Sequence, residues 1–380
     1  MQVARVGLSM LSSLALVECS SPQAALDGGA HTIAEAGPAA DCGQGGACGD
    51  GSSPAAPDGG GSAGVEAGAT GRCGDGGPIV TLASGQTAAG PLAVTATDVY
   101  WTSLGGNTVS KVPICGGEVT TLAVNIQGGV PFSVASPASA LAVDATNVYW
   151  GAETATAMQG GWTSGPNVVL KVPLAGGTLA TIATGGGTGG VRVDHANVYW
   201  ATDQGGVMKE PLTGGAPASA ATGNAPLGLA IDAANVYWID SMNVMKAPIA
   251  GGAPATLATG NDVNVPRAIA VDATAVYWTN YAFSRANGSV MKVPIAGGTP
   301  MTLASQLDYP SGIAVDGSNV YWVDDGTSTS PGAVLRVPST GGTPTTLTSS
   351  VNPSAIAVDA NNVYWTADKY PNGTVMQMPK

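Results

Sequence analysis

Five aspartates are the residues of this sequence that could most readily bind a metal ion. Each follows a recurring Val-Tyr-Trp tripeptide within three positions; they are Asp203, Asp240, Asp324, Asp325 and Asp368. Carboxylate oxygens are the ligands that Ca²⁺ prefers, so a cluster of them would support a calcium-dependent hydrolase or lyase. Aspartate is also a common capping residue, because its side chain accepts hydrogen bonds from the backbone of its own turn. We favour the capping interpretation and keep the calcium enzyme as the alternative function.

The sequence contains few of the residues that other kinds of catalytic site require. The chain contains two histidines, His31 and His195, which excludes a site built on several histidine ligands. His195 follows Asp194 in a predicted turn, and no Ser-His-Asp or Cys-His set can be assembled. We therefore predict no catalytic residue and expect a non-enzymatic protein without a cofactor, calcium being the ion that the alternative function would add.

Acidic residues outnumber lysines and arginines by 25 to 13, which gives a net charge of −12. Proteins that bind nucleic acids need a basic surface, so we exclude nucleic acid as a partner. Glycine and proline are abundant, at 56 and 26 residues, and charged residues make up only 10% of the chain. This composition excludes a charged helical bundle or a coiled coil.

One motif is repeated seven times. The Val-Tyr-Trp tripeptide ends at Trp101, Trp150, Trp200, Trp238, Trp278, Trp322 and Trp365. A segment such as IAVDATN precedes it, and segments such as VMKVPIAGG and TPTTLA follow it. Each piece is a short β-type run bounded by Asp, Asn or Gly turn residues. Four strands in a repeat of about 40 residues are typical of a propeller blade, so we predict an all-β, seven-bladed β-propeller over residues 74–380.

The ends of the repeat region indicate how the ring closes. The last repeat stops at Lys380, after its third strand, whereas residues 76–83 (GGPIVTLA) match an isolated fourth strand. We predict that this N-terminal strand completes the last blade, which also protects a sheet edge. Within each blade, we expect the Tyr and Trp of the second strand to point to opposite faces and to fill the gaps on both sides.

A polar pattern indicates contacts between neighbouring blades. A basic residue stands two positions before the proline of most third strands, as in Lys246 and Lys292, and an aspartate ends most first strands, as in Asp232 and Asp272. Pairing each base with the aspartate of the next blade matches every charge, so our hypothesis is a ring of Lys–Asp contacts. The alternative is that the aspartates cap their own turns and the lysines are solvated.

The repeat resembles that of a known family. The consensus IAVDATNVYW, the WTAD of residues 365–368 and the segment VMKVPIAGG are similar to the YWTD-type propeller repeat of the low-density lipoprotein receptor family. Similar repeats occur in exported bacterial proteins. The resemblance covers about residues 74–380 and implies a β-propeller. Receptor-type propellers have six blades, whereas seven repeats are present here, and we carry over no receptor partner.

A binding surface is expected on one face of the ring. The loops from the fourth strand to the first, and from the second to the third, share this face and hold the variation between repeats. Function usually resides on loops that a rigid scaffold positions. We predict that this loop-rich face binds a protein, peptide or glycan through Trp162, Arg267, Tyr281, Phe283 and Tyr370. The alternative is that the long loops are tolerated insertions; we expect a monomer in either case.

The first 19 residues are similar to an export signal. Arg5 precedes an apolar stretch at residues 6–17, and Cys19 resembles the lipidated cysteine of a bacterial lipoprotein signal; an ordinary secretory signal is the alternative. Residues 20–73 are rich in Gly, Ala, Ser and Pro, which predicts a disordered linker. We therefore expect export to the periplasm, outer membrane or surface of a bacterium, with membrane contact only through a lipid anchor.

Four further cysteines could form disulfides in an exported protein. They are Cys42, Cys48, Cys73 and Cys115, which allow three pairings. We favour Cys42–Cys48 together with Cys73–Cys115. Metal binding by these cysteines is disfavoured, because the sequence contains no CxxC pair.

Overall fold

The computed structural model describes ten stretches of the chain. They are residues 79–103, 105–124, 141–158, 161–202, 205–224, 226–281, 286–326, 331–350, 352–367 and 372–380, without the side chains of 153–158, 161–166 and 187–188. The predicted export signal, the lipidation of Cys19 and the linker lie outside these stretches. Among the helices that the described stretches contain, none is long and apolar enough to cross a membrane.

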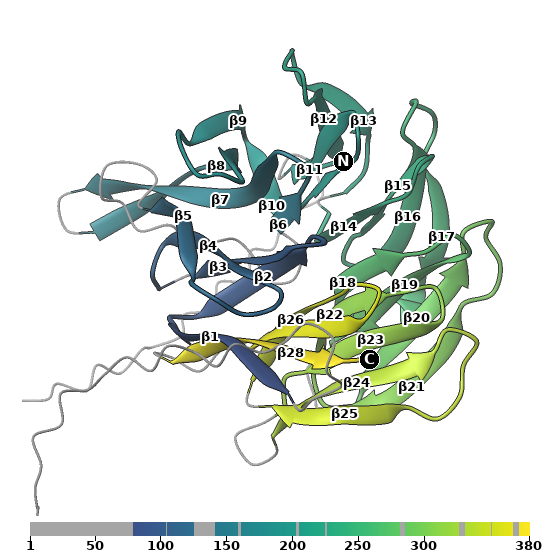
Figure 1. The fold of residues 1–380 in the computed structure, drawn as a ribbon. Helices are drawn as coiled ribbons and strands as arrows, with labels where there is room; N and C mark the ends of the chain where they lie inside the picture. The colour runs from purple at the N-terminus through teal and green to yellow at the C-terminus, as the bar shows by residue number, and fades with distance from the viewer. Residues whose placement is uncertain are drawn as a thin grey trace, which may run out of the picture. The chain divides into compact units, whose positions relative to one another are not determined.

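The described residues form seven antiparallel sheets of four strands each, which are the blades of a propeller (Figure 1). Blade 1 contains β2 (Ala89–Val94), β3 (Asp98–Ser103), β4 (Thr108–Pro113) and β5 (Thr120–Val124). Blade 2 contains β6 (Leu141–Val143), β7 (Asn147–Met158), β8 (Gly161–Pro173) and β9 (Ala180–Thr184). Blade 3 contains β10 (Gly186–Val193), β11 (Asn197–Thr202), β12 (Val207–Pro211) and β13 (Ala218–Ala221).

The remaining blades follow the same order. Blade 4 contains β14 (Gly228–Ile231), β15 (Asn235–Ile239), β16 (Asn243–Pro248) and β17 (Ala255–Thr259), and a 3₁₀ turn, η1 (Gly260–Asp262), follows it. Blade 5 contains β18 (Pro266–Val271), β19 (Ala275–Asn280), β20 (Gly288–Pro294) and β21 (Met301–Leu307). Blade 6 contains β22 (Pro310–Val315), β23 (Asn319–Asp324), β24 (Gly332–Pro338) and β25 (Thr345–Ser350). Blade 7 contains β26 (Pro353–Val358), β27 (Asn362–Ala367), β28 (Gly373–Pro379) and β1 (Val80–Gln86).

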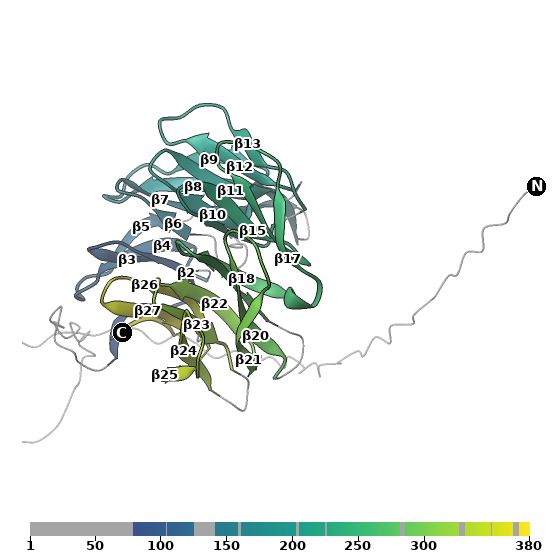
Figure 2. The same cartoon turned by 90° about the vertical axis from the view of Figure 1, so that its right-hand side faces the viewer.

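The innermost strands form the inner wall of the ring. In chain order, the first strands of neighbouring blades contact one another from β2 to β26, and β26 returns to contact β2. Figures 1 and 2 both show the yellow β26 beside the dark blue β2, at the junction of the last blade with the first. The predicted all-β, seven-bladed propeller is therefore confirmed.

Strand β1 completes blade 7, as the repeat count predicts. It pairs antiparallel with β28, so that Val80 lies opposite Gln377 and Thr81 opposite Met376. Leu82 and Ala83 of this strand are buried against blade 1 and blade 7 residues. This pairing joins the N-terminal strand to the C-terminal blade and so closes the ring.

Each gap between blades is filled by a tyrosine of one blade and a tryptophan of the next. Tyr237 and Trp278 share one buried cluster, and Tyr364 and Trp101 share the cluster that closes the ring. The other five clusters repeat this arrangement. The seven tryptophans are no more than 2% exposed, so each contributes up to about 4–6 kcal/mol of gross burial free energy. The predicted orientation of these rings is confirmed.

Lysines of the third strands cross the gaps but do not reach the predicted aspartates. The Nζ atoms of Lys209, Lys246 and Lys292 donate to the carbonyl oxygens of Ile249, Ile295 and Ser339 in the next blade, at 2.7, 2.7 and 2.6 Å. The direction of the contact agrees with our hypothesis. The acceptor does not, so the hypothesis of a Lys–Asp ring is wrong.

The aspartates cap their own turns. Oδ1 of Asp272 accepts the backbone N–H groups of Thr274 and Ala275 at 2.7 and 2.9 Å, and Oδ2 accepts the Tyr277 hydroxyl at 2.9 Å. Burial alone would raise the pKa of Asp272, but these hydrogen bonds outweigh it and hold the pKa below its ordinary value. With the Thr274 hydroxyl at 2.8 Å, this carboxylate has four donors from its own blade. Five blades repeat this turn, at Asp144, Asp194, Asp232, Asp316 and Asp359.

Candidate functional site

The loop-rich face brings Arg267 and Tyr281 together at one end of blade 5. Pro266 lies opposite Asn280 and Ala268 opposite Thr279, so Arg267 is the extra residue of a β-bulge at the start of β18. Bulges often re-aim a side chain beside a functional site. The guanidinium carbon of Arg267 lies 5.2 Å from the centre of the Tyr281 ring, within range of a cation–π contact.

The backbone just before Arg267 is in an unusual conformation. Val265 has a φ of 52°, in the left-handed region that a β-branched residue rarely adopts. Its carbonyl oxygen accepts the backbone N–H of Tyr281 at 2.9 Å. Backbone strain of this kind costs about 1–3 kcal/mol and concentrates at functional sites.

Blade 6 contributes the other half of the site. The rings of Tyr281 and Tyr309 are 5.2 Å apart between centroids and inclined at 38°. Asp325 follows β23, and its backbone N–H donates to the carbonyl of Tyr309 at 3.1 Å. The Ser311 hydroxyl donates to Oδ1 of Asp325. We call Arg267, Tyr281, Tyr309, Ser311 and Asp325 the blade 5–6 cluster.

The electrostatics of the cluster depend on burial. The pKa of Asp325 is raised to about 6, mainly by burial and to a smaller extent by nearby Asp324, while Ser311 and Arg267 oppose the shift. Burial also raises the pKa of the Tyr281 hydroxyl, with Asp325 as the next contributor. The Nε of Arg267 is buried, and among the described residues it has no hydrogen-bond partner. A buried donor without a partner is costly.

Two of the five aspartates predicted as metal ligands act as turn caps. The Asp324 carboxylate accepts the backbone N–H groups of Asp308 and Tyr309, both at 3.1 Å. Asp240 is 3% exposed and accepts the backbone N–H groups of Met242 and Asn243. Within the described stretches, no three His, Cys, Asp or Glu side chains gather as a ligand set. Asp203 and Asp368 lie outside those stretches, so the metal site stays a prediction.

Several other predicted residues also lie outside what the structure describes. They are Phe283, Tyr370, the side chain of Trp162, and Cys19, Cys42, Cys48 and Cys73. Cys115, in the turn after β4, is disulfide-bonded. Its pairing with Cys73 stays a prediction.

Tyr309 and Ser311 were not predicted from the sequence. Neither residue type is rare in loops, and neither stands at a spacing that indicates chemistry. Their position offers the only signal, because both flank Pro310, the first residue of β22, as Val265 and Arg267 flank Pro266.

Comparisons with known proteins support the fold. The chain matches no protein-family model and no curated protein sequence. Among solved structures, a streptogramin B lyase is 11% identical, with a TM-score of 0.57, over 79% of this chain and 96% of that chain. A virginiamycin B lyase from Staphylococcus aureus is 11% identical, with a TM-score of 0.56, over 79% of this chain and 98% of that chain. At this identity the likeness concerns the fold alone.

A chain from a nidogen/laminin complex is 23% identical over 53% of this chain and 82% of that chain, with a TM-score of 0.42. This similarity is too low to carry an argument about function.

Proposed function

We propose that the chain is an exported, lipid-anchored and non-enzymatic β-propeller that binds a protein or peptide through its loop-rich face. The observation that carries this proposal is the blade 5–6 cluster. It presents two half-buried tyrosines and the guanidinium of Arg267, which lies over the Tyr281 ring. Tyrosine and arginine are enriched among the residues that dominate protein–protein binding energy.

The ligand chemistry follows from the groups in the cluster. The tyrosine rings offer apolar surface with a polar edge. Asp325 titrates near pH 6 and so accepts a hydrogen bond from a ligand amide in its charged form. These groups favour a polypeptide among the three predicted ligand classes, which were protein, peptide and glycan.

The test is a selection from a displayed random peptide library, run beside a glycan array on the same purified chain. We expect the enriched peptides to lose at least about tenfold in affinity, roughly 1.4 kcal/mol, with Tyr281→Ala and with Arg267→Ala. His195→Ala is the matched control, because His195 is exposed in a turn between the first two strands of blade 3, at the opposite end of those strands from the loop-rich face. Binding to glycans alone, or peptide binding that both cluster variants retain, would overturn the proposal.

The competing hypothesis, a calcium-dependent hydrolase or lyase, makes a different prediction. A ligand that binds only the folded state raises the melting temperature. Our proposal expects the same midpoint in EDTA and after addition of Ca²⁺. A calcium-dependent rise would instead support the metal site and justify assays with lactones.

Export and lipid anchoring need a separate experiment. We expect a fatty-acid label to be incorporated into the chain when it is produced in bacteria, and to be lost in Cys19→Ser. Export without labelling of the native sequence would favour an ordinary secretory signal.

A further inference from the structure

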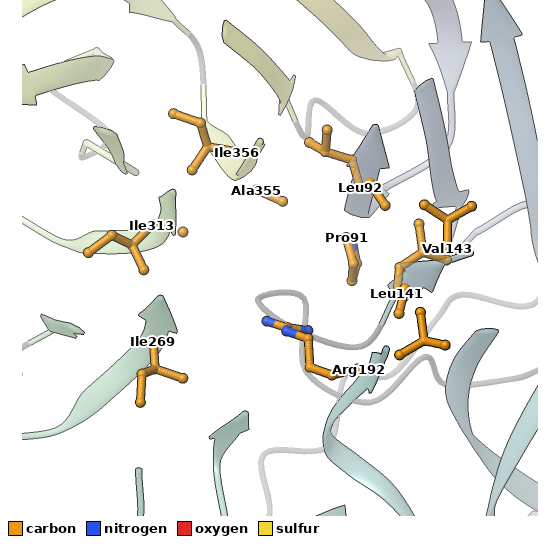
Figure 3. Close-up of a pocket in the computed structure, with 13 residues that line it drawn as sticks. Pro91, Leu92, Leu141, Val143, Arg192, Ile269, Ile313, Ala355 and Ile356 are labelled. Carbon is orange, nitrogen blue, oxygen red and sulfur yellow. The ribbon is translucent and has the colours of Figure 1, made fainter. Parts of the chain in front are cut away.

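The two halves of the blade 5–6 cluster lie at the start of neighbouring strands. These strands, β18 and β22, contact one another and both line a cavity on the axis of the ring. Figure 3 shows Ile269 of β18 beside Ile313 of β22 in the wall of this cavity. Arg267 and Ser311 stand two positions before these isoleucines. A contact that joins the two strands at this level therefore sets the spacing between the two halves of the cluster.

Thr279 of β19 makes this contact through its hydroxyl group. Oγ1 accepts the backbone N–H of Ala268 at 3.1 Å and donates to the backbone carbonyl of Ser311 at 2.8 Å. All three residues are no more than 3% exposed. Ala268 directly follows the bulged residue Arg267, where the ladder with β19 is locally disrupted. The hydroxyl thus pairs one buried backbone group from each half of the cluster.

Ser311 extends this connection to the carboxylate. Its side-chain hydroxyl donates to Oδ1 of Asp325. Thr279 therefore holds the backbone of the residue that orients Asp325, and it also holds the backbone beside Arg267. The two charged groups of the cluster come from different blades, and this buried hydroxyl links the strands that carry them.

The fold does not require a hydroxyl at this position. In four blades the residue after the tryptophan of the Val-Tyr-Trp motif is aliphatic or glycine, namely Gly151, Ala201, Ile239 and Val323. Ile239 and Val323 are 0% exposed, as Thr279 is. An aliphatic side chain therefore fills this place in the ring, and the hydroxyl of Thr279 adds the connection between the strands.

Blade 7 repeats the hydrogen bonds at another junction. Thr366 accepts the backbone N–H of Ala355 at 3.2 Å and donates to the carbonyl of Gly90 in blade 1 at 3.0 Å. The bulged residue here is Ser354, in place of an arginine. The Ser354 carbonyl lies 3.4 Å from the Ser311 hydroxyl, a long contact that contributes little. Thr366 is therefore a matched control for Thr279.

We propose that Thr279 is a positioning residue of the blade 5–6 cluster, whose hydroxyl sets the spacing between Arg267 and Asp325 before a ligand arrives. This inference rests on the proposed peptide-binding function. A site whose groups are already ordered loses less conformational freedom on binding, so preorganisation raises affinity. Without the hydroxyl, the cluster keeps all its side chains, but its two halves are free to move apart.

The first experiment measures the affinity of the peptides selected with the native chain. Thr279→Val removes the hydroxyl at nearly constant volume, and we expect it to weaken binding at least about fivefold. Thr279→Ser keeps the hydroxyl and should restore the native affinity. Thr366→Val should bind like the native chain, although valine at either position leaves one buried N–H and one carbonyl unpaired.

The second experiment needs no ligand. Carbon-13 NMR of the Asp325 carboxyl group follows its titration. The hydrogen bond from Ser311 lowers the pKa of Asp325, and it depends on the position that Thr279 gives to Ser311. We expect Thr279→Val to raise this pKa, and Thr279→Ser and Thr366→Val to leave it at the native value. If no peptide is selected, the proposed function fails, but this titration still tests the role of Thr279.

The proposal would be overturned by an unchanged peptide affinity in Thr279→Val, or by an unchanged titration of Asp325. Equal effects of Thr279→Val and Thr366→Val would also overturn it, because they would show a general loosening of the ring. Failure of Thr279→Ser to restore both properties would assign the effect to the methyl group. If Thr279→Val does not fold, Thr279→Ala takes its place, because Ala201 occupies the same position in blade 3.

Discussion

Replacement of Trp278 by alanine should destabilise the propeller by about 3–5 kcal/mol. The Trp278 side chain is 0% exposed and lies in the gap between blades 4 and 5, beside Tyr237 and Met291. A ring of this size buries up to about 250 Å², or about 6 kcal/mol gross at 25 cal/mol per Å². Alanine retains a little of that area, and the remaining cavity adds to the loss.

A second component comes from one hydrogen bond. Nε1 of Trp278 donates to the carbonyl of Asp262 at 2.9 Å, whereas Nε1 of Trp322 is buried and has no hydrogen-bond partner among the described residues. Phenylalanine at either position removes the same atoms, but only Trp278→Phe breaks a bond. We expect Trp278→Phe to cost about 1 kcal/mol more than Trp322→Phe.

Denaturant unfolding followed by far-ultraviolet circular dichroism measures these differences. The free energy of unfolding of the native chain and the three variants would be compared at equal slopes. A cost below about 1 kcal/mol for Trp278→Ala would refute the packing argument. Equal costs for the two phenylalanine variants would refute only the contribution of the hydrogen bond.

Four further predictions follow from the fold and the site. Deletion of residues 80–86 removes the strand that pairs with β28 and should lower the melting temperature by roughly 10 °C or more; an unchanged melt would show that closure does not need β1. The capping aspartates have folded-state pKa values below the ordinary value, with that of Asp316 at about 2. Their stabilisation is therefore present above the unfolded pKa of about 3.9 and is lost as the pH falls through the folded values. The urea midpoint should decrease from pH 4 to pH 2.5, an interval in which Asp325 is protonated in the folded chain, and Asp272→Asn should make that decrease smaller. The pKa of Asp325 is raised to about 6, so its ionisation opposes folding increasingly as the pH rises from the unfolded pKa of about 3.9 to the folded value. Asp325→Asn should therefore raise stability at pH 8 by up to about 3 kcal/mol, with little change at pH 3.5. An equal effect at both pH values would contradict this cause. Val265→Asn should stabilise the folded chain by about 1 kcal/mol in the same melts. Asparagine tolerates a positive φ better than valine, and Asn352 adopts a φ of 45° at the matching position before Pro353. A loss of stability would show that the Val265 side chain makes stabilising contacts.

The fold was predictable from the sequence because each blade repeats the same strand segments, turn residues and buried aromatic pair. Trp278 and its equivalents fill the same gap every time, and the missing fourth strand of the last repeat identifies β1 as its substitute. The acceptors of Lys246 and Lys292 were not predictable in the same way. A charge pattern indicates which blades meet, but it does not say whether a lysine reaches a carboxylate or a carbonyl oxygen of the next blade.

The candidate sites were predictable only in part. Arg267 and Tyr281 stand out by residue type in a variable loop, whereas Tyr309 and Ser311 join them only through the packing of blade 6 on blade 5.

The pairing of β1 with β28 has a consequence for protein synthesis. Thr81 and Met376 touch although they are 295 residues apart in the chain. At about 5–20 residues per second, a ribosome takes on the order of 15–60 s to make that interval. During this time β1 has no native partner, and an unpaired strand edge invites association with other chains. The nascent chain therefore needs protection from aggregation until β28 emerges. Because synthesis runs from the N-terminus, β1 is made first but is the last strand to find its partner.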